Sequence, residues 1–157
     1  MSKIFIAADH AGFSLKEELK PFLTELGHEV EDCGAHAHVD GDDFPDYVRP
    51  CAERVAVTQG SFGIVIGASG QGEAMAANRI PRVRAAVYYG DPHRTQTDTT
   101  GHILSLLEAA RAHNDANILS LGARFLTKDE AKTAVSTFLA TSFGGESHHL
   151  RRIEKLG

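Results

Sequence analysis

Short apolar runs alternate with amphipathic segments along this chain, and this alternation limits its possible fold more than any other feature. Helical segments are expected between and after the runs, so that strands and helices alternate five times. Such an order predicts βαβ units, in which parallel strands form one sheet and helices cover both of its faces. The sequence therefore indicates an α/β fold. The expected strands are residues 3–9, 28–34, 62–67, 83–89 and 117–123.

Two of the expected helices begin with a capping-box pattern, in which a hydroxyl residue is followed three positions later by glutamate. Ser14 and Glu17 form this pattern in the first helix, which also contains Pro21, a residue expected to bend it. The same pattern opens a later helix at Thr127 and Glu130. A final amphipathic helix is expected at residues 147–156.

The connection between the fourth and fifth expected strands is long for a compact α/β domain. It begins as a polar loop after Tyr89 and is expected to become a helix from about Thr100. Long connections often form lids or binding elements. The chain contains no linker, repeat or low-complexity tract. We therefore expect residues 1–157 to form a single domain with an insertion at about 90–104.

The bulk composition is that of a globular protein and argues against several classes of function. The formal net charge of −5 disfavours a nucleic-acid partner, because phosphate backbones attract basic proteins. No apolar run has the length of a membrane span, and the first residues lack a signal-peptide pattern. Cys33 and Cys51 form neither a disulfide framework nor a zinc motif. We expect reduced thiols, a cytoplasmic location, and no membrane partner.

A glycine-rich turn joins the third strand to the next helix in the stretch IVIGASGQGEAMAANR, residues 64–79. Glycines permit backbone conformations and close approaches that other residues do not. The glycine order is neither the dinucleotide fingerprint G-x-G-x-x-G nor a P-loop. Backbone N–H groups in such a turn bind anions, either a phosphate or a developing oxyanion. The residues expected to supply them are Ala68, Ser69, Gly70, Gln71 and Gly72.

Glu73 lies directly after this turn. A carboxylate in the first turn of a helix is stabilised by the helix dipole, and this alone accounts for a glutamate there. Carbon-acid chemistry needs the same pair of features, a base beside N–H groups that stabilise an enediolate oxygen. Glu73 is therefore a candidate general base as well as an ordinary helix-capping carboxylate.

Other strand ends also carry polar residues that could act on a ligand, since ligands of such folds bind at the carboxyl ends of the strands. Asp9 and His10 follow the first strand, where they could transfer protons or simply cap the next segment. His113 and Asn114 precede the fifth strand and Arg124 follows it.

The last helix adds a basic run at its start. Arginines there could hold a phosphate, although a solvated basic face is the commoner outcome. The residues of this run are His148, His149, Arg151 and Arg152. A second polar cluster could suggest a metal site, but a polar loop explains it and the ligand spacing is not distinctive. It comprises His36, His38, Asp40, Asp42 and Asp43.

The motifs AADHAG, GASGQGEAMAANR, AHNDANILSLGAR and RRIE together resemble the family of ribose-5-phosphate isomerase B and the galactose-6-phosphate isomerase subunits. The resemblance keeps their order over nearly the whole chain. It implies a Rossmann-like three-layer α/β/α sandwich with a five-stranded parallel sheet and a C-terminal helix. It also implies conversion of ribose 5-phosphate to ribulose 5-phosphate without metal or cofactor, in a homodimer or tetramer whose sites are shared between subunits.

Many members of that family carry a cysteine base at the end of the third strand, where this chain has Gly67. Another branch, seen in actinobacterial members, uses a glutamate six residues further on, and here that residue is Glu73. The resemblance implies that His113 assists opening of the furanose ring, that Asp9 handles hydroxyl protons, and that the backbone from Ala68 to Gly72 holds the enediolate. It assigns substrate binding, mostly of the phosphate, to His10, Asn114, Arg124 and Arg152.

Two departures from the family pattern leave the substrate open. His148 stands where the family has the first of two C-terminal arginines, and the insertion after Tyr89 adds roughly ten residues. Another sugar phosphate, such as a hexose 6-phosphate or a tetrose phosphate, is therefore an alternative substrate. A non-catalytic sugar-phosphate binding module is a second alternative. A metal-dependent hydride-shift isomerase is a third, for which we find no ligand set.

Overall fold

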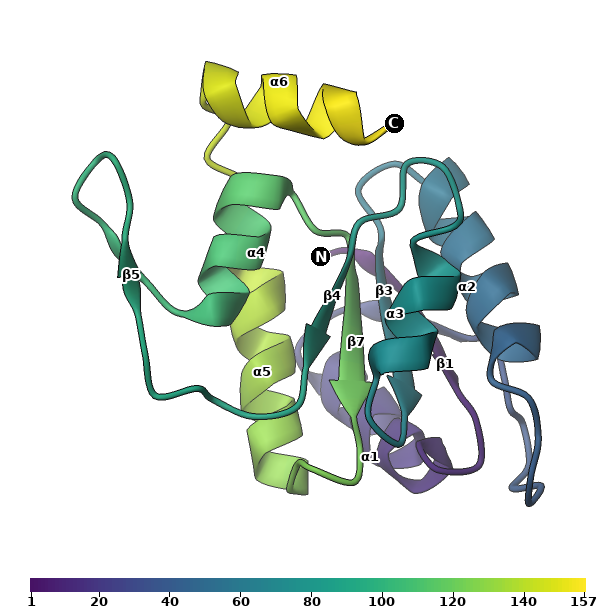
Figure 1. The fold of residues 1–157 in the computed structure, drawn as a ribbon. Coiled ribbons are helices and arrows are strands. Elements are labelled where there is room, and N and C mark those ends of the chain that lie inside the picture. The colour runs from purple at the N-terminus through teal and green to yellow at the C-terminus, as the bar shows by residue number, and fades with distance from the viewer.

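The computed structural model describes all residues from 1 to 157 and contains one parallel sheet with helices on both faces (Figure 1). The strand order is β2-β1-β3-β7-β4, and every pairing in this sheet is parallel. The predicted α/β class and the five-stranded parallel sheet are confirmed. The strands are β1 (Lys3–Ala8), β2 (Glu29–Asp32), β3 (Phe62–Gly67), β4 (Ala85–Tyr88) and β7 (Ile118–Gly122).

The two faces of the sheet bury two separate apolar clusters, because successive side chains of a strand point to opposite faces. Ile4 and Ile6 of β1 belong to the cluster under α1, α4 and α5, whereas Phe5 belongs to the cluster under α2 and α3. The fold is therefore a three-layer sandwich. The helices are α1 (Phe13–Glu25), α2 (Pro45–Val57), α3 (Gln71–Ala77), α4 (Leu106–Asn114) and α5 (Lys128–Ala140).

The C-terminal helix α6 (Ser147–Leu156) forms where the sequence predicts it, but it lies outside the sandwich and packs on α4 (Figure 1). Only His149 is buried in this helix, and Leu150 and Leu156 remain exposed. A large part of its apolar face is thus uncovered in a single chain.

The predicted start of the fourth long helix at about Thr100 is wrong. Residues on both sides of Thr100 form an antiparallel hairpin of β5 (Gln96–Thr97) and β6 (Ile103–Leu104), which projects beside α4 (Figure 1). The helix begins only at Leu106, because Ser105 accepts a hydrogen bond from the Glu108 backbone N–H and the Glu108 side chain accepts one from Ser105.

One of the two predicted capping boxes is also wrong. Helix α1 starts at Phe13, after Gly12, with no side-chain cap, so that Ser14 lies inside the helix. A Cβ at position 12 would lie 2.4–2.7 Å from atoms of Ile66 in β3, so the space beside this strand admits only glycine there. The second box is confirmed, with reciprocal hydrogen bonds between Thr127 and Glu130. None of the helices has the length and apolar character that a bilayer crossing requires.

Candidate active site

The carboxyl ends of β1, β3 and β7 lie side by side, because these three strands are neighbours in the sheet. Asp9 follows β1, the glycine turn follows β3 and Arg124 follows β7. The backbone N–H of Ala123 donates to the Gly67 carbonyl at 2.8 Å, and that of Arg124 donates to the Ala68 carbonyl at 3.1 Å. These bonds fix the Arg124 backbone beside the glycine turn.

The glycine turn is held from below and leaves N–H groups unpaired. Gly70 has a φ of 77°, a conformation that favours glycine, and its carbonyl accepts a hydrogen bond of 2.6 Å from the buried Ser120 hydroxyl. The N–H of Gln71 donates to the Ser69 hydroxyl at 3.3 Å. Such a turn presents donors to an anion. The N–H groups without an acceptor in the chain are those of Ala68, Ser69, Gly70 and Gly72.

Glu73 is buried, with 4% of its surface exposed, and its carboxylate lies against the backbone of Gly67. A Cβ at position 67 would overlap that carboxylate, so the glycine at the end of β3 is what makes room for it. Burial raises the pKa of the Glu73 carboxyl, and the nearby Asp9 carboxylate raises it further, against a hydrogen bond from its own backbone N–H. A carboxyl tuned in this way is suited to accept and return a proton.

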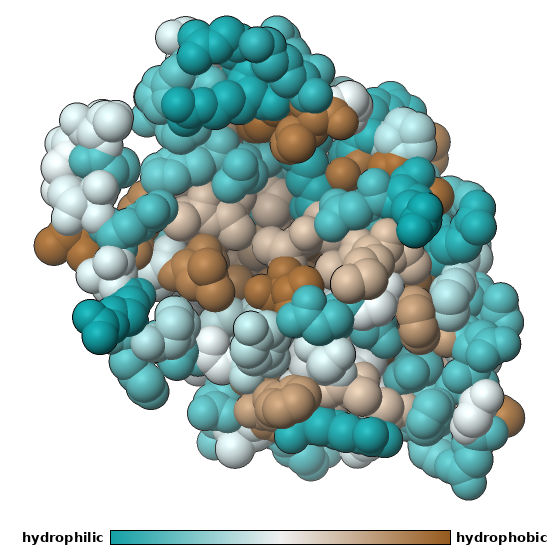
Figure 2. Space-filling view, viewed as in Figure 1, coloured by the Kyte–Doolittle hydropathy of each residue, from teal (hydrophilic) through white to brown (hydrophobic).

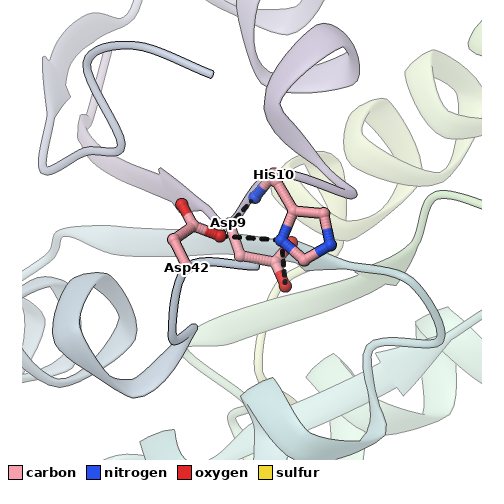
Figure 3. Close-up of side chains that lie close together, drawn as sticks. All are labelled: Asp9, His10 and Asp42. Atoms are coloured by element: carbon pink, nitrogen blue, oxygen red, sulfur yellow. Dashed lines mark hydrogen bonds and ion pairs between the residues drawn. The ribbon is translucent and has the colours of Figure 1, made fainter. Parts of the chain in front are cut away.

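Asp9, His10 and Asp42 form one cluster (Figure 3), and its Asp9 carboxylate lies within electrostatic reach of Glu73. Asp9 Oδ1 accepts the backbone N–H groups of Ala11 and Gly12 at 3.0 and 3.2 Å, which leaves Oδ2 facing the His10 ring at 4.0 Å. Asp42 Oδ1 accepts from both the His10 backbone N–H and ring Nδ1, at 2.9 and 2.8 Å. The ring is therefore oriented with Nε2 free.

The electrostatics of His10 favour its charged form. The hydrogen bond to Asp42 raises the pKa of His10, the Asp9 carboxylate adds to this, and the Arg124 guanidinium opposes it. The same contact lowers the pKa of Asp42, although burial alone would raise it. His10, whose protonated form is favoured, and Arg124 thus lie close enough to bind one anion together. Sequence reasoning missed this role of Asp42, which it grouped with His36 and His38.

The loop histidines that the sequence analysis attributes to a polar loop do not supply ligand atoms to this cluster. His36 is 74% exposed and lies 4.0 Å from Asp32, and His38 lies 3.6 Å from Asp40. The ligand atoms that come together are instead those of Asp9, His10 and Asp42, within 4.8 Å of one another. The Nδ1–H···Asp42 hydrogen bond accounts for this proximity without a metal.

Four predicted site residues lie at the opposite end of the sheet from Glu73. His113 and Asn114 end α4, just before β7 begins, whereas Arg124 follows the end of β7. A strand of 5 residues separates these two ends by roughly 15 Å. His113 stacks on His149 at 4.4 Å, and His148 contacts His149 at 4.0 Å. This second group comprises His113, Asn114, His148 and Arg152.

A buried carboxyl with a raised pKa, set beside unpaired backbone N–H groups at a parallel-sheet edge, defines a class: α/β enzymes that move a proton on carbon. Residues 4–156 match the family model described as Ribose/Galactose Isomerase. The chain belongs to the ribose/galactose isomerase family.

Curated relatives and solved structures agree with this membership. The chain is 35% identical to ribose-5-phosphate isomerase B of Mycobacterium tuberculosis over 154 residues, 98% of this chain and 87% of the relative. It resembles the crystal structure of the Thermotoga maritima enzyme with 38% identity and a TM-score of 0.84, over 99% and 97% of the two chains. The Mycoplasma genitalium enzyme, solved with bound ribulose-5-phosphate, gives 34% identity and a TM-score of 0.85, over 98% and 93%.

Proposed function

We propose that this protein is an aldose–ketose isomerase that interconverts ribose 5-phosphate and ribulose 5-phosphate through a cis-enediolate. The observation that carries the proposal is the buried Glu73 carboxylate, seated in space that only glycine at position 67 leaves open, beside a turn of unpaired N–H groups. The relatives named ribose-5-phosphate isomerase B support the choice of substrate. We assign residues 1–157 to one sugar-phosphate isomerase domain.

The proposed reaction needs one base for carbon and one group for the hydroxyl protons. Glu73 removes the C2 proton of the open-chain aldose and returns it to C1, and the N–H groups of the glycine turn stabilise the enediolate oxygens formed in between. Asp9, within electrostatic reach of Glu73, moves the proton between O2 and O1. The side chains in this proposal neither gain nor lose electrons, so no cofactor is required.

The residues that bind the phosphate are proposed to come from both ends of the sheet, and the residue that opens the sugar ring from one of them. His10 and Arg124 bind phosphate from the Glu73 end, since Arg124 is cationic and the hydrogen bond from His10 to Asp42 favours the protonated form of His10. Asn114, His148 and Arg152 contribute from the opposite end, where His113 is placed to protonate the sugar ring oxygen. These residues cannot reach Glu73 of their own chain across the length of β7.

We therefore propose a homodimer, or a tetramer built from two such dimers, in which each site joins the Glu73 end of one copy to the His113 end of another. Two surface features support this pairing. Strand β4 is an edge strand of half-exposed residues, and a cavity of about 580 Å³ next to it is lined by Ile80, Val83, Asn114 and Leu156. Apolar surface gathers in the hollow below α6 (Figure 2). We also propose a cytoplasmic location, which the two free thiols support.

The test of the base is Glu73→Gln, with Glu53→Gln on the exposed face of α2 as the matched control. In D₂O, the wild-type protein and the control should exchange the C1 proton of ribulose 5-phosphate, and Glu73→Gln should lower this exchange by about 10²–10⁴-fold. Exchange at the wild-type rate in the folded Glu73→Gln protein rules out the assignment. A panel of pentose, hexose and tetrose phosphates, with unphosphorylated sugars as controls, identifies the substrate.

The shared site has a separate test by subunit mixing. Glu73→Gln and His113→Ala should each be inactive as pure proteins. After they are unfolded together and refolded, half of the dimers are mixed and each has one intact site, so about a quarter of wild-type activity should return. Activity that stays at the level of the pure variants contradicts sharing between copies.

A further inference from the structure

The insertion hairpin reaches back to His113, the residue proposed to open the sugar ring. Asp98 lies at the hairpin turn, and its Oδ2 is 3.9 Å from His113 Nε2 and 3.7 Å from His102 Nδ1. Gln96, on the adjacent strand β5, places its amide nitrogen 3.4 Å from His113 Nδ1. The insertion therefore faces both ring nitrogens of His113.

The Asp98 carboxylate divides its two oxygens between two tasks. Oδ1 accepts three hydrogen bonds that build the turn, from the Thr100 N–H at 2.8 Å, the Thr100 hydroxyl at 2.7 Å and the His102 N–H at 2.9 Å. Because Oδ1 is saturated in this way, Oδ2 is left to face His113 and His102. The side chain is 12% exposed, so the hairpin fixes it in place.

The hydrogen bonds of the turn also favour the ionised form of Asp98. The Thr100 hydroxyl, followed by the N–H groups of His102 and Thr100, lowers the pKa of Asp98 to about 2 against the effect of burial. On the other side of His113, the His149 ring stacks at 4.4 Å with an interplanar angle of 12°. The imidazole thus faces a carboxylate at one edge, 3.9 Å from Nε2, and stacks on a parallel ring.

We propose that Asp98 is a positioning residue for His113: its carboxylate, at ion-pair distance from Nε2, favours a proton on that nitrogen, so that Nδ1 is directed at the ring oxygen of the aldose. This rests on the proposed function, and in particular on the role of His113 there. Gln96 is exposed and its contact with Nδ1 is long, so a sugar oxygen can replace it.

The step that Asp98 supports is opening of the furanose ring. The imidazolium gives its Nδ1 proton to the ring oxygen, the bond from C1 to that oxygen breaks, and the O1 proton passes to Asp9 of the other copy as the C1 carbonyl forms. His113 is left neutral with its remaining proton on Nε2, opposite the Asp98 carboxylate. Asp98 itself stays ionised, and proton exchange with solvent restores both His113 and Asp9.

The chemistry of the two sugars offers a test that separates this step from proton transfer on carbon. Ribose 5-phosphate is mainly a furanose and must be opened, whereas ribulose 5-phosphate cannot close a furanose ring because its O5 is esterified. Asp98→Asn keeps an oxygen for the three hydrogen bonds of the turn and removes the charge facing His113. Asp91→Asn is the matched control, since Asp91 Oδ1 accepts only the His93 N–H in the same insertion.

We expect Asp98→Asn to lower kcat for ribose 5-phosphate by about tenfold to a hundredfold. This is less than the roughly 10²–10⁴-fold that a general acid contributes, because His113 itself remains. In the same variant, exchange of the C1 proton of ribulose 5-phosphate with D₂O should stay within about twofold of the wild-type rate. In Asp91→Asn, both the kcat for ribose 5-phosphate and this exchange should stay within about twofold of wild type. Equal loss of the two activities in Asp98→Asn, or loss of neither, overturns the proposal.

Nitrogen chemical shifts of the His113 ring give a second readout that does not depend on activity. The neutral ring should be the Nε2–H tautomer in the wild-type protein and a mixture of tautomers in Asp98→Asn. An unchanged tautomer overturns the positioning role even if the enzyme is active. Wild-type protein that turns over no sugar phosphate overturns the proposed function instead, while the tautomer measurement still reports whether Asp98 orients His113.

Discussion

A methyl group added at the end of β3 should disable the enzyme, although the substitution removes no polar atom. In Gly67→Ala the added Cβ enters the space of the Glu73 carboxylate. It would overlap Oε1 and lie 2.6 Å from Oε2, so the carboxylate has to retreat by roughly 1 Å or more to reach van der Waals distance. The turn that follows offers little room, because Ser120 and the Arg124 backbone hold it.

The size of the effect follows from this displacement. A reacting group misplaced by about 1 Å can lose about 10²-fold in rate, so kcat should fall by about that factor. Overpacking costs about 1–3 kcal/mol of stability, which lowers Tm by about 2–4 °C for each kcal/mol in a chain of this size. KM should change little, because His10 and Arg124 lie outside the overlap.

The assay is steady-state isomerisation of ribose 5-phosphate together with calorimetric unfolding. Adding Glu73→Ala to Gly67→Ala removes the overlapping carboxylate, so the double variant should regain stability relative to Gly67→Ala alone, with a coupling energy of about 1 kcal/mol or more. A Gly67→Ala protein with kcat within about threefold of wild type would refute the argument that this carboxylate, in this place, is the base.

Three further predictions concern charge. The KM for ribose 5-phosphate should rise with pH as His10 loses its proton. Asp42→Asn should lower the pKa of His10, so that this rise begins at a lower pH and the KM near neutrality is roughly tenfold higher than in the wild-type protein. A KM profile unchanged between pH 5 and 9 contradicts this. Because folding raises the pKa of Glu73, the ionised carboxyl costs stability above its ordinary pKa, and Glu73→Gln should raise Tm at pH 7 and leave it unchanged at pH 3, as calorimetry can check. Arg111→Met should lose about 2–3 kcal/mol in urea unfolding, since Arg111 is buried against Phe138 and donates to the Ala116 carbonyl at 2.7 Å, while kcat per folded molecule stays at the wild-type value.

The sheet could be predicted from the sequence because each buried strand is a short apolar run followed by turn residues. The insertion could not, since the apolar pattern of its helix extends backwards into β6 and gives no boundary. The boundary is set by Ser105 and Glu108, a capping box inside that apolar run, and by the turn at Asp98. At α1 the opposite error arises, because Ser14 and Glu17 have the right spacing but the helix has already begun at Phe13.

The candidate site, too, could be predicted from the sequence only in part. Asp9, Glu73 and Arg124 could be found because each directly follows a strand or its turn, and those strand ends meet at one edge of the sheet. Asp42 could not, since it comes from a loop 32 residues away from His10 and its contact depends on tertiary folding. The family motif predicts a role for His113, but its distance from Glu73 within one chain appears only in three dimensions.

The Glu73 carboxylate against Gly67 also has a consequence for the sensitivity of this site to oxidants and thiol-directed reagents. A carboxylate base cannot be oxidised to a sulfenic acid or capped by a thiol-directed alkylating agent, as a cysteine thiolate in the same place can. The two cysteines of the chain lie elsewhere: Cys51 is on the buried face of α2, and Cys33 is half-buried after β2. The isomerase activity should therefore persist at concentrations of peroxide or iodoacetamide that inactivate an enzyme with a thiolate base. Covalent inhibitors that react with cysteine should not inhibit this protein at its proposed base.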